Sequence, residues 1–339
     1  MLAESTMNLK TAVLVVGCLT SAGSWCPLRA QGTFPSSINS QGVVTGYFAD
    51  VTVRVPRGFA RDQFGNITVL DVPVSCGGVT LPRSINAQGA ITGMFGDCSS
   101  SFGHGFVLDP LGNLTVFDAP GNMLGTNPFS INNDGTITGS AYDATTSHGF
   151  VRDPRGNFTI FDVPGAYLTL PYSINAQGAI TGFYLESPVG MGRGFVRDPT
   201  GNFTTFNAGP LETIPESINN QGTITGWFTR DNESPSGFVR DPQGNITTFE
   251  PIPTETYPVS INAQGAITGF VDVNGVVSSF VRDPQGNITT FDAGGESPTT
   301  TSINNQGVVT GSLWNGGHYS GFVRDPQGKI TVFDVPGSV

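Results

Sequence analysis

Charged side chains are scarce in this sequence, and lysine is nearly absent. Lys, Arg, Asp and Glu together make up 12% of the 339 residues, and the only lysines are Lys10 and Lys329. Fifteen basic residues against 26 acidic ones give a net charge of −11. An acidic surface repels phosphates, so we expect neither nucleic acid nor anionic lipid as a partner.

Long apolar runs are missing except near the N-terminus. Residues 11–23 are largely apolar, follow a polar segment and precede Leu28-Arg29-Ala30. This order is typical of a secretory signal, and the apolar stretch is too short for a permanent membrane span. We predict a signal segment over residues 1–30, cleaved after Ala30 or earlier at 22–24, and a secreted, periplasmic or extracellular protein. The alternative is lipoprotein processing, which would leave a lipid anchor on Cys18.

Cysteine and catalytic motifs are also few. Cys18 and Cys26 fall within the predicted signal, which leaves Cys76 and Cys98. An even pair in an exported protein predicts a disulfide, and two unpaired thiols are the alternative. The chain has no Gly-x-Ser-x-Gly, no His-Glu-x-x-His and no phosphate-binding loop. No catalytic residue is therefore predicted, a non-enzyme is favoured, and the question of a cofactor stays open.

What the sequence has instead is one module copied seven times. The Asn of a Ser-Ile-Asn triplet recurs every 42 to 47 residues, at Asn39, Asn86, Asn132, Asn175, Asn219, Asn262 and Asn304. Each copy holds four short runs rich in Ile, Val, Thr and Phe, separated by Gly, Pro, Asn and Asp, which is typical of hairpin-linked strands. We name these runs a (Ser-Ile-Asn), b (Ile-Thr-Gly), c (Gly-Phe-Val-Arg-Asp) and d (Ile-Thr-x-Phe-Asp).

A period of this length with four strands per copy predicts an all-β, seven-bladed β-propeller over residues 31–339. A β-solenoid is the alternative. In a meander the a–b and c–d turns share one end, and they are nearly identical in every copy. The b–c turns and d–a links vary and share the other end, which also holds both cysteines. Because the d–a link is the longest connection, strand a should be innermost.

Binding residues on rigid β scaffolds usually lie in variable loops, so we predict the binding site on the variable face. Aromatic rings beside carboxylates suit a glycan or a protein partner. The predicted binding residues are Tyr142, Tyr184, Asp231, Glu233, Trp314 and Tyr319. We expect a monomer.

Two recurring positions are interpreted as structural. Strand c carries Arg61, Arg152, Arg197, Arg240, Arg282 and Arg324, and strand d ends on Asp71, Asp118, Asp162, Glu250, Asp292 and Asp334. Because they recur once per copy, we predict Arg–carboxylate bridges between strands or blades. The histidines His104, His148 and His318 lie in the b–c region. This region lies away from the axis, so we expect ordinary packed or exposed histidines and no shared metal site.

Two copies resemble a known repeat family. They carry His104-Gly105-Phe106 with Ile85-Asn86-x-x-Gly89-x-x-x-Gly93, and His148-Gly149-Phe150 with Ile131-Asn132-x-x-Gly135-x-x-x-Gly139. These motifs resemble the bacterial extracellular HAF repeats, although Gly stands where that family has Ala. The Ile-Asn-x-x-Gly part occurs in all seven copies. The resemblance implies an exported, propeller-shaped protein of no assigned activity. The run at 244–249 also resembles part of the streptogramin lyase repeat.

Three functions remain open from the sequence. The first is a binding module for a glycan or protein. The second is a propeller hydrolase or lyase acting on a polysaccharide or lactone, and the third is a structural cell-surface repeat protein.

Overall fold

The computed structural model describes residues 31–50, 55–73, 78–96, 102–230, 234–251 and 255–338. Their regular structure consists of 28 β-strands, which form seven consecutive groups of four, named blades 1 to 7 here. No helix long and apolar enough to cross a bilayer occurs in these ranges. The predicted signal segment lies outside them.

The strands have the following bounds. Blades 1 and 2 contain β1 (Gly32–Ile38), β2 (Val44–Ala49), β3 (Pro56–Arg61), β4 (Ile67–Leu70), β5 (Val79–Ile85), β6 (Ile91–Gly96), β7 (His104–Leu108) and β8 (Leu114–Phe117). Blades 3 and 4 contain β9 (Gly125–Ile131), β10 (Ile137–Tyr142), β11 (Ser147–Arg152), β12 (Phe158–Phe161), β13 (Leu168–Ile174), β14 (Ile180–Leu185), β15 (Arg193–Arg197) and β16 (Phe203–Phe206). Blades 5 to 7 contain β17 (Thr213–Ile218), β18 (Ile224–Phe228), β19 (Ser236–Arg240), β20 (Ile246–Phe249), β21 (Glu255–Ile261), β22 (Ile267–Val273), β23 (Val276–Arg282), β24 (Ile288–Phe291), β25 (Glu296–Ile303), β26 (Val309–Trp314), β27 (Tyr319–Arg324) and β28 (Ile330–Phe333).

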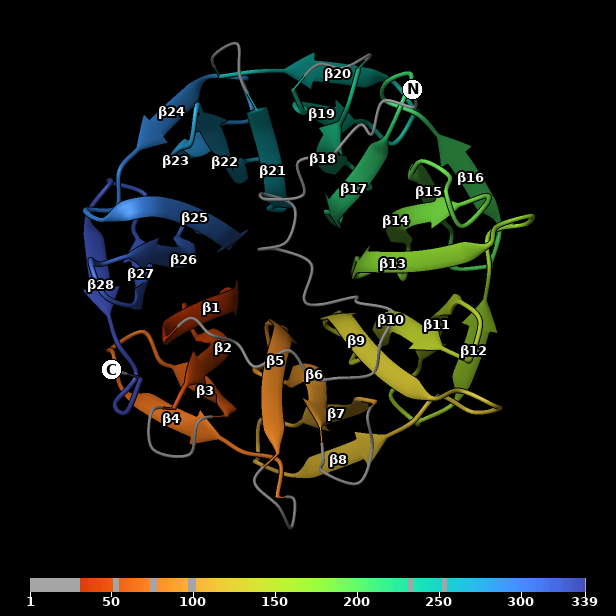
Figure 1. Cartoon of the computed structure of the whole chain (residues 1–339), viewed down its shortest axis with the longest axis horizontal. Helices are drawn as coiled ribbons and strands as arrows, with labels where there is room; N and C mark the ends of the chain where they lie inside the picture. Colours follow the sequence, from red (N-terminus) through yellow and green to blue (C-terminus); the bar gives the residue numbers. More distant parts are fainter. Residues whose placement is uncertain are drawn as a thin grey trace, which may run out of the picture.

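The blades are antiparallel meanders arranged around an axis. Blades 2 to 6 are separate four-stranded sheets, whereas blades 1 and 7 are joined by the single parallel pair Gly32–Tyr319. The first strand of every blade lies nearest the centre of the ring and the fourth lies at its rim (Figure 1). The all-β propeller predicted from the repeat is confirmed, as is the innermost position of strand a.

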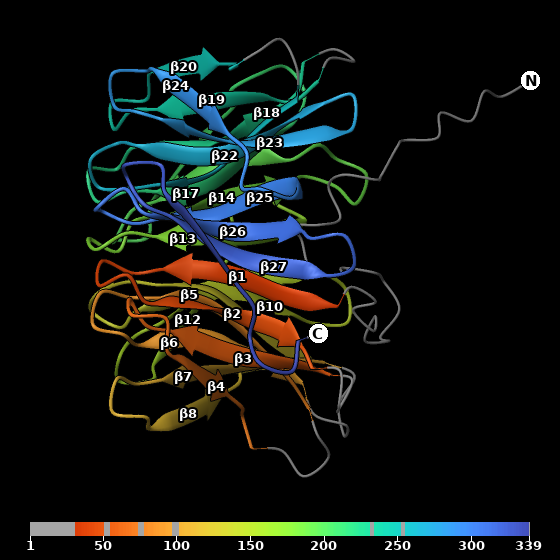
Figure 2. The same cartoon turned by 90° about the vertical axis from the view of Figure 1, so that its left-hand side faces the viewer.

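The a–b and c–d turns lie together at one end of the ring (Figure 2). Both need glycine: Gly222 in the a–b turn has φ 84° and Gly244 in the c–d turn has φ 97°, a region that other residues rarely adopt. A Cβ on Gly222 would lie 3.7 Å from the side chain of Pro242, so the two turns are in contact. The prediction that both turns share an end is confirmed.

The hydrophobic core lies between neighbouring blades. In blade 3, Ile137, Ala141 and Phe150 are fully buried and pack with Phe117 and Ala119 from the end of blade 2. The same arrangement closes the ring, because Val335 packs against the core residues of blade 1. Each blade thus buries its apolar face against the outer strand of the blade before it.

A β-bulge interrupts every innermost strand just before its Ser-Ile-Asn triplet. In blade 5 the register shifts between Pro215 and Ser217, which leaves Glu216 as the extra residue. The bulge presses the strand against β18, where a Cβ on Gly226 would lie 2.1 Å from the carbonyl oxygen of Ile214. Only glycine fits opposite the bulge, which explains the Ile-Thr-Gly run in strand b.

Candidate functional site: the propeller axis

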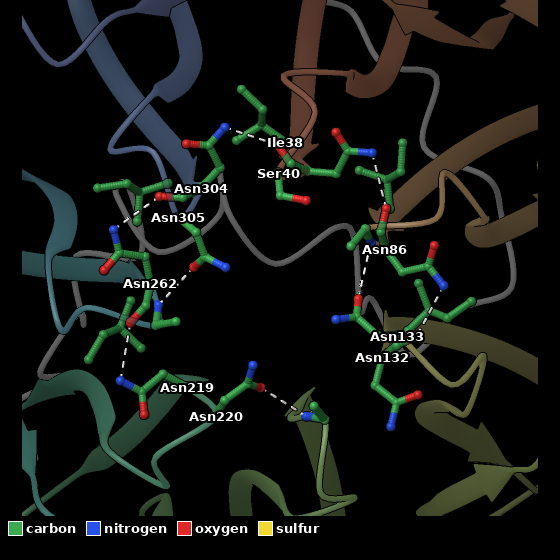
Figure 3. A pocket seen from close by; sticks show the side chains of 18 of the residues that line it. Ile38, Ser40, Asn86, Asn132, Asn133, Asn219, Asn220, Asn262, Asn304 and Asn305 are labelled. Atoms are coloured by element: carbon green, nitrogen blue, oxygen red, sulfur yellow. Dashed lines mark hydrogen bonds between the residues drawn. The ribbon is translucent and has the colours of Figure 1, made fainter.

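Seven asparagines form a closed hydrogen-bonded ring around the axis. The Nδ2 of each Ser-Ile-Asn asparagine donates to the backbone carbonyl of its counterpart in the next blade, at 2.9–3.1 Å. The Oδ1 of Asn219 accepts the backbone N–H groups of Gln221 and Thr223, so one side chain shapes its own turn and bonds the next blade. All seven asparagines are buried. We call this set the asparagine ring (Figure 3).

A second ring of hydrogen bonds links neighbouring blades one residue earlier in each triplet. Here the donor lies in the following blade and the acceptor in the preceding one. In blade 6, the backbone N–H of Ile261 donates to the Oγ of Ser217 in blade 5, at 3.3 Å. The same bond occurs at all seven junctions, with lengths of 3.3–3.4 Å. The Ser-Ile-Asn triplet therefore links neighbouring blades by hydrogen bonds.

A cavity of about 190 Å³ opens at this end of the axis. It is lined by the seven isoleucines of the triplets, by six members of the asparagine ring (all but Asn175) and by residues that follow the ring in sequence. No charged side chain is among its lining residues. We call it the axial cavity.

The bulged position of the innermost strand is where the copies disagree most. It lies between two otherwise repeated residues, yet every blade has a different side chain there: Ser36, Arg83, Phe129, Tyr172, Glu216, Val259 and Thr301. The position is three residues before the asparagine ring, or roughly 10 Å along a strand. All seven are half-buried. We call them the variable ring.

Arg83 of the variable ring lies on the inner side of the blades. Arg83 of blade 2 interacts electrostatically with Tyr172 of blade 4, and also with Tyr47 of blade 1. Blades 2 and 4 are not neighbours, so these side chains can approach each other only on the inner side of the ring. The Nε of Arg83 is buried without a partner, and none of the described residues accepts a hydrogen bond from its guanidinium. Burial lowers the pKa of Arg83.

Glu216 lies three blades away from Arg83 and is held by one hydrogen bond, from Trp227 Nε1 at 3.2 Å. Burial raises the pKa of Glu216 to about 7, although the bond from Trp227 opposes the shift. No ion pair joins Glu216 to Arg83 within the described ranges. Arg83 and Glu216 are therefore not paired with each other.

Two aromatic rings separate these charges. Phe129 and Tyr172 contact each other edge to face at 5.4 Å, and Tyr172 contacts Phe183 at 5.5 Å. Burial and the nearby Glu216 raise the pKa of Tyr172, so its hydroxyl is neutral at physiological pH. Blades 2 to 5 thus present a guanidinium, two aromatic faces and a carboxyl group in succession, opposite the smaller Val259, Thr301 and Ser36.

Among the residues that the structure describes, the repeated arginines of strand c do not form the predicted salt bridges to carboxylates. Instead each guanidinium lies over the phenylalanine that ends the preceding blade, 4.6–5.1 Å from the ring centroid. Arg240, for example, stacks on Phe206 and also donates to the carbonyl of Asp241. The prediction of a structural role between blades agrees with this geometry, but the partner is aromatic.

In blades 1, 2, 3 and 5 the acidic residue at the end of strand d pairs with the residue that precedes Gly-Phe in strand c. In blade 1, Arg57 binds both Asp50 and Asp71. In blade 3, His148 takes the same place, with Nδ1 2.8 Å from Asp162 and Nε2 3.3 Å from Asp143.

The other two histidines have similar partners. His104 lies 2.8 Å from Asp118, and His318 lies 3.5 Å from Asp334. The three histidines therefore pair on separate blades. No group of His, Cys, Asp and Glu in the described ranges could hold a metal ion.

The four predicted binding residues that the structure describes are not gathered at one site but lie on blades 3, 4 and 7. Tyr184 is 5% exposed and belongs to the core between blades, so its interpretation as a loop aromatic is wrong. Tyr142 is half-buried at the end of β10, where its hydroxyl accepts the N–H of Gly103 at 3.4 Å. Asp231 and Glu233 lie outside the described residues.

Trp314 and Tyr319 face each other at the ends of β26 and β27, with ring centroids 5.1 Å apart. Tyr319 also contacts Phe34, which stacks on Tyr47 beside Arg83. This aromatic chain connects two predicted binding residues, Trp314 and Tyr319, to the variable ring. Cys76 and Cys98 lie outside the described residues, so their disulfide stays a prediction.

Comparison with known proteins supports the fold. Neither a protein-family model nor a curated relative matches the sequence. The chain is similar to a streptogramin B lyase structure, with a TM-score of 0.57 and 18% identity over 91% of this chain and 96% of the other. A catalytically inactive virginiamycin B lyase from Staphylococcus aureus with quinupristin gives 0.56 and 15%, over 91% and 98%. The β-propeller domain of the Trilobed protease from Pyrococcus furiosus gives 0.64 and 10%, over 91% and 98%. At these identities the likeness shows the propeller fold alone.

The variable ring was missed in the sequence although a signal was present. Each member directly precedes the serine of a Ser-Ile-Asn triplet, so aligning the seven copies shows seven residue types at one position. The variation in loop length favoured the variable face as the binding site instead.

Proposed function

We propose that this chain is an exported, seven-bladed β-propeller that binds a glycan without catalysis, and that the variable ring is its binding site. One observation carries the proposal. A chain built from near-identical copies places seven different side chains at one position of its innermost strand, and these include an arginine whose buried Nε has no hydrogen-bond partner. Ligand sites combine apolar walls with a few polar groups in this manner.

The chemistry of the variable ring favours an acidic glycan. The Arg83 guanidinium suits a carboxylate, because it can donate two parallel hydrogen bonds. Phe129 and Tyr172 offer apolar faces of the kind that pack on sugar rings. Glu216, Ser36 and Thr301 supply partners for sugar hydroxyl groups. We infer that an oligosaccharide containing a uronic acid is the best match.

Calorimetric titration with uronic-acid oligosaccharides and neutral ones of equal length tests the proposal. We expect preference for the acidic series and at least a tenfold loss of affinity in Arg83→Gln. Arg155→Gln is the matched control, since Arg155 is exposed in a c–d turn. Unchanged affinity in Arg83→Gln, with binding lost in Trp314→Ala, would move the site to the variable face. Binding of a protein partner and of no glycan would also overturn the proposal.

A second candidate is a hydrolase or lyase, and the carboxyl group of Glu216 favours it. A pKa of about 7 suits a group that transfers protons at neutral pH. Two structural neighbours are described as lyases of streptogramin B and virginiamycin B. Assays with a streptogramin B lactone and with polysaccharides, with and without chelator, test this candidate. Activity that disappears in Glu216→Gln would support it, and no turnover of any substrate would remove it.

A further inference from the structure

The residue after each member of the asparagine ring alternates between alanine and asparagine. In blade order from blade 2 to blade 1 the seven residues are Ala87, Asn133, Ala176, Asn220, Ala263, Asn305 and Ser40. Asn133, Asn220 and Asn305 thus sit on alternate blades around the axial cavity. We call them the amide triad.

The orientation of each triad amide is fixed by a backbone N–H group. The Oδ1 atoms of Asn133, Asn220 and Asn305 accept the N–H of the alanine in the preceding blade, at 3.1, 3.0 and 2.9 Å. An N–H group can only donate, so the oxygen must face it and the amide nitrogen must face the other way. The three nitrogens therefore point into the central opening (Figure 3).

The amide triad presents donors without acceptors of its own. The side chains of Asn133, Asn220 and Asn305 are exposed, and none of the described residues accepts a hydrogen bond from their Nδ2 atoms. The cavity that they line contains no carboxylate to repel an anion. The hydroxyl of Ser40, also in the lining, adds a fourth donor on the remaining blade.

We propose that the amide triad binds one oxyanion group, a carboxylate, sulfate or phosphate, on the propeller axis. Amide N–H groups donate to the oxygens of such anions, and the three donors come from alternate blades around one axis. Hydrogen bonds to a charged acceptor are stronger than those between neutral groups. The proposal does not depend on the variable ring, which lies deeper along the same strands.

Nuclear magnetic resonance of the side-chain amides tests the proposal on the intact protein. Sodium sulfate, sodium phosphate and sodium acetate would be titrated at constant ionic strength, with sodium chloride as the balancing salt. We expect the chemical shifts of the three triad NH2 groups to change saturably as salt is added. The salt that saturates the change at the lowest concentration identifies the preferred anion. If no salt gives a saturable shift, or chloride gives the same shift, the proposal is overturned.

A triple variant, Asn133→Asp with Asn220→Asp and Asn305→Asp, separates binding from structure. Each Asp keeps an oxygen facing the alanine N–H but replaces the donor with a negative oxygen. We therefore expect the anion affinity, measured for wild type and variants by calorimetric titration, to fall more than tenfold. The matched control is Gln41→Glu with Gln177→Glu and Gln264→Glu. It adds the same charge on exposed residues of the equivalent a–b turns of blades 1, 4 and 6, outside the cavity lining. Anion affinity that is equal in both variants would contradict the proposal.

Discussion

The side-chain amide of Asn304 lies 2.9 Å from the backbone carbonyl oxygen of Asn39, 265 residues earlier in the chain. This hydrogen bond completes the asparagine ring between blades 7 and 1. Its equivalents at the other six junctions have nearly the same length. The asparagine ring therefore consists of one contact repeated at seven junctions. Its contribution to stability can be measured at any single blade.

Substitution of Asn219 should destabilise the protein strongly. Asn219→Ala removes two acceptor bonds within its turn and one donor bond to Asn262. At ~1 kcal/mol per bond we expect a loss of about 3 kcal/mol in the free energy of unfolding. Urea unfolding measures it. Asn245→Ala is the control, because that exposed amide bonds only within its own turn; an equal loss in both variants would contradict a special role for the asparagine ring.

The stacking of Arg240 on Phe206 should contribute a measurable coupling energy. A double-mutant cycle of Arg240→Leu and Phe206→Leu isolates the pair, and leucine is the residue that blade 2 carries naturally as Leu108. We expect a coupling of about 0.5–1 kcal/mol between the two side chains, from urea unfolding of all four proteins. Additive losses would show that the arginine acts through its contact with Asp241 instead.

Glu216 should make the protein less stable as pH rises toward neutrality. Its folded-state pKa of about 7 lies above its ordinary value of 4.5, so the folded protein binds the extra proton between these values. The free energy of unfolding contributed by Glu216 therefore falls as pH rises from about 4.5 to about 7, and stays low above it. Glu216→Gln can still accept the Trp227 bond and has no such proton. Its stability advantage over the wild type should grow across this window, and a constant difference would refute the assignment.

His148 should contribute a second, opposite type of pH dependence. Burial lowers the pKa of His148, but the hydrogen bonds and charges of Asp162 and Asp143 raise it by a larger amount. The net shift of the pKa is therefore upward from 6.5. Stability from this site is fully present below 6.5 and is lost as pH rises through the folded-state pKa. His148→Arg copies the arrangement of Arg57 in blade 1, and the arginine should remain paired with its carboxylates at every pH in this range. Urea unfolding of both proteins from pH 5 to pH 9 measures the difference, and parallel curves would contradict the pairing.

The fold could be predicted because its signals are local. A glycine at positive φ in each turn and alternating apolar strands determine a hairpin without knowledge of the rest of the chain. The length of the repeat then limits the ways in which four-stranded units can pack. Strand a was placed correctly from the lengths of the links.

The contacts between blades were harder to predict because they join residues more than 40 positions apart. Arginine in strand c was expected to bind an acid, yet it stacks on phenylalanine of the preceding blade. The sequence did contain a clue: the only copy with leucine in place of that arginine, Leu108, follows the only copy with Leu70 in place of the phenylalanine. The two exceptions meet in the same core.

The variable ring could not be predicted from the place of its members on a strand. A residue on a repeated strand usually indicates structure and a residue in a variable loop usually indicates function, which favours Tyr142, Tyr184, Trp314 and Tyr319 as binding residues. The innermost strand has a free edge facing the axis, and its bulge turns one further side chain inward. Arg83 and Glu216 occupy that position.

The junction between blades 7 and 1 also has a consequence for how the chain could be rearranged. Thr33 accepts the N–H of Val335, just as Thr80 accepts that of Val72 within the continuous chain. The noncovalent joint thus repeats the bonds made where a peptide link is present, and no strand is exchanged across it. A circular permutant could join residues 31 and 338 through a short linker and be cut in another d–a link. It should form the same ring, because the junction between blades 7 and 1 is held by the same contacts with or without a peptide link.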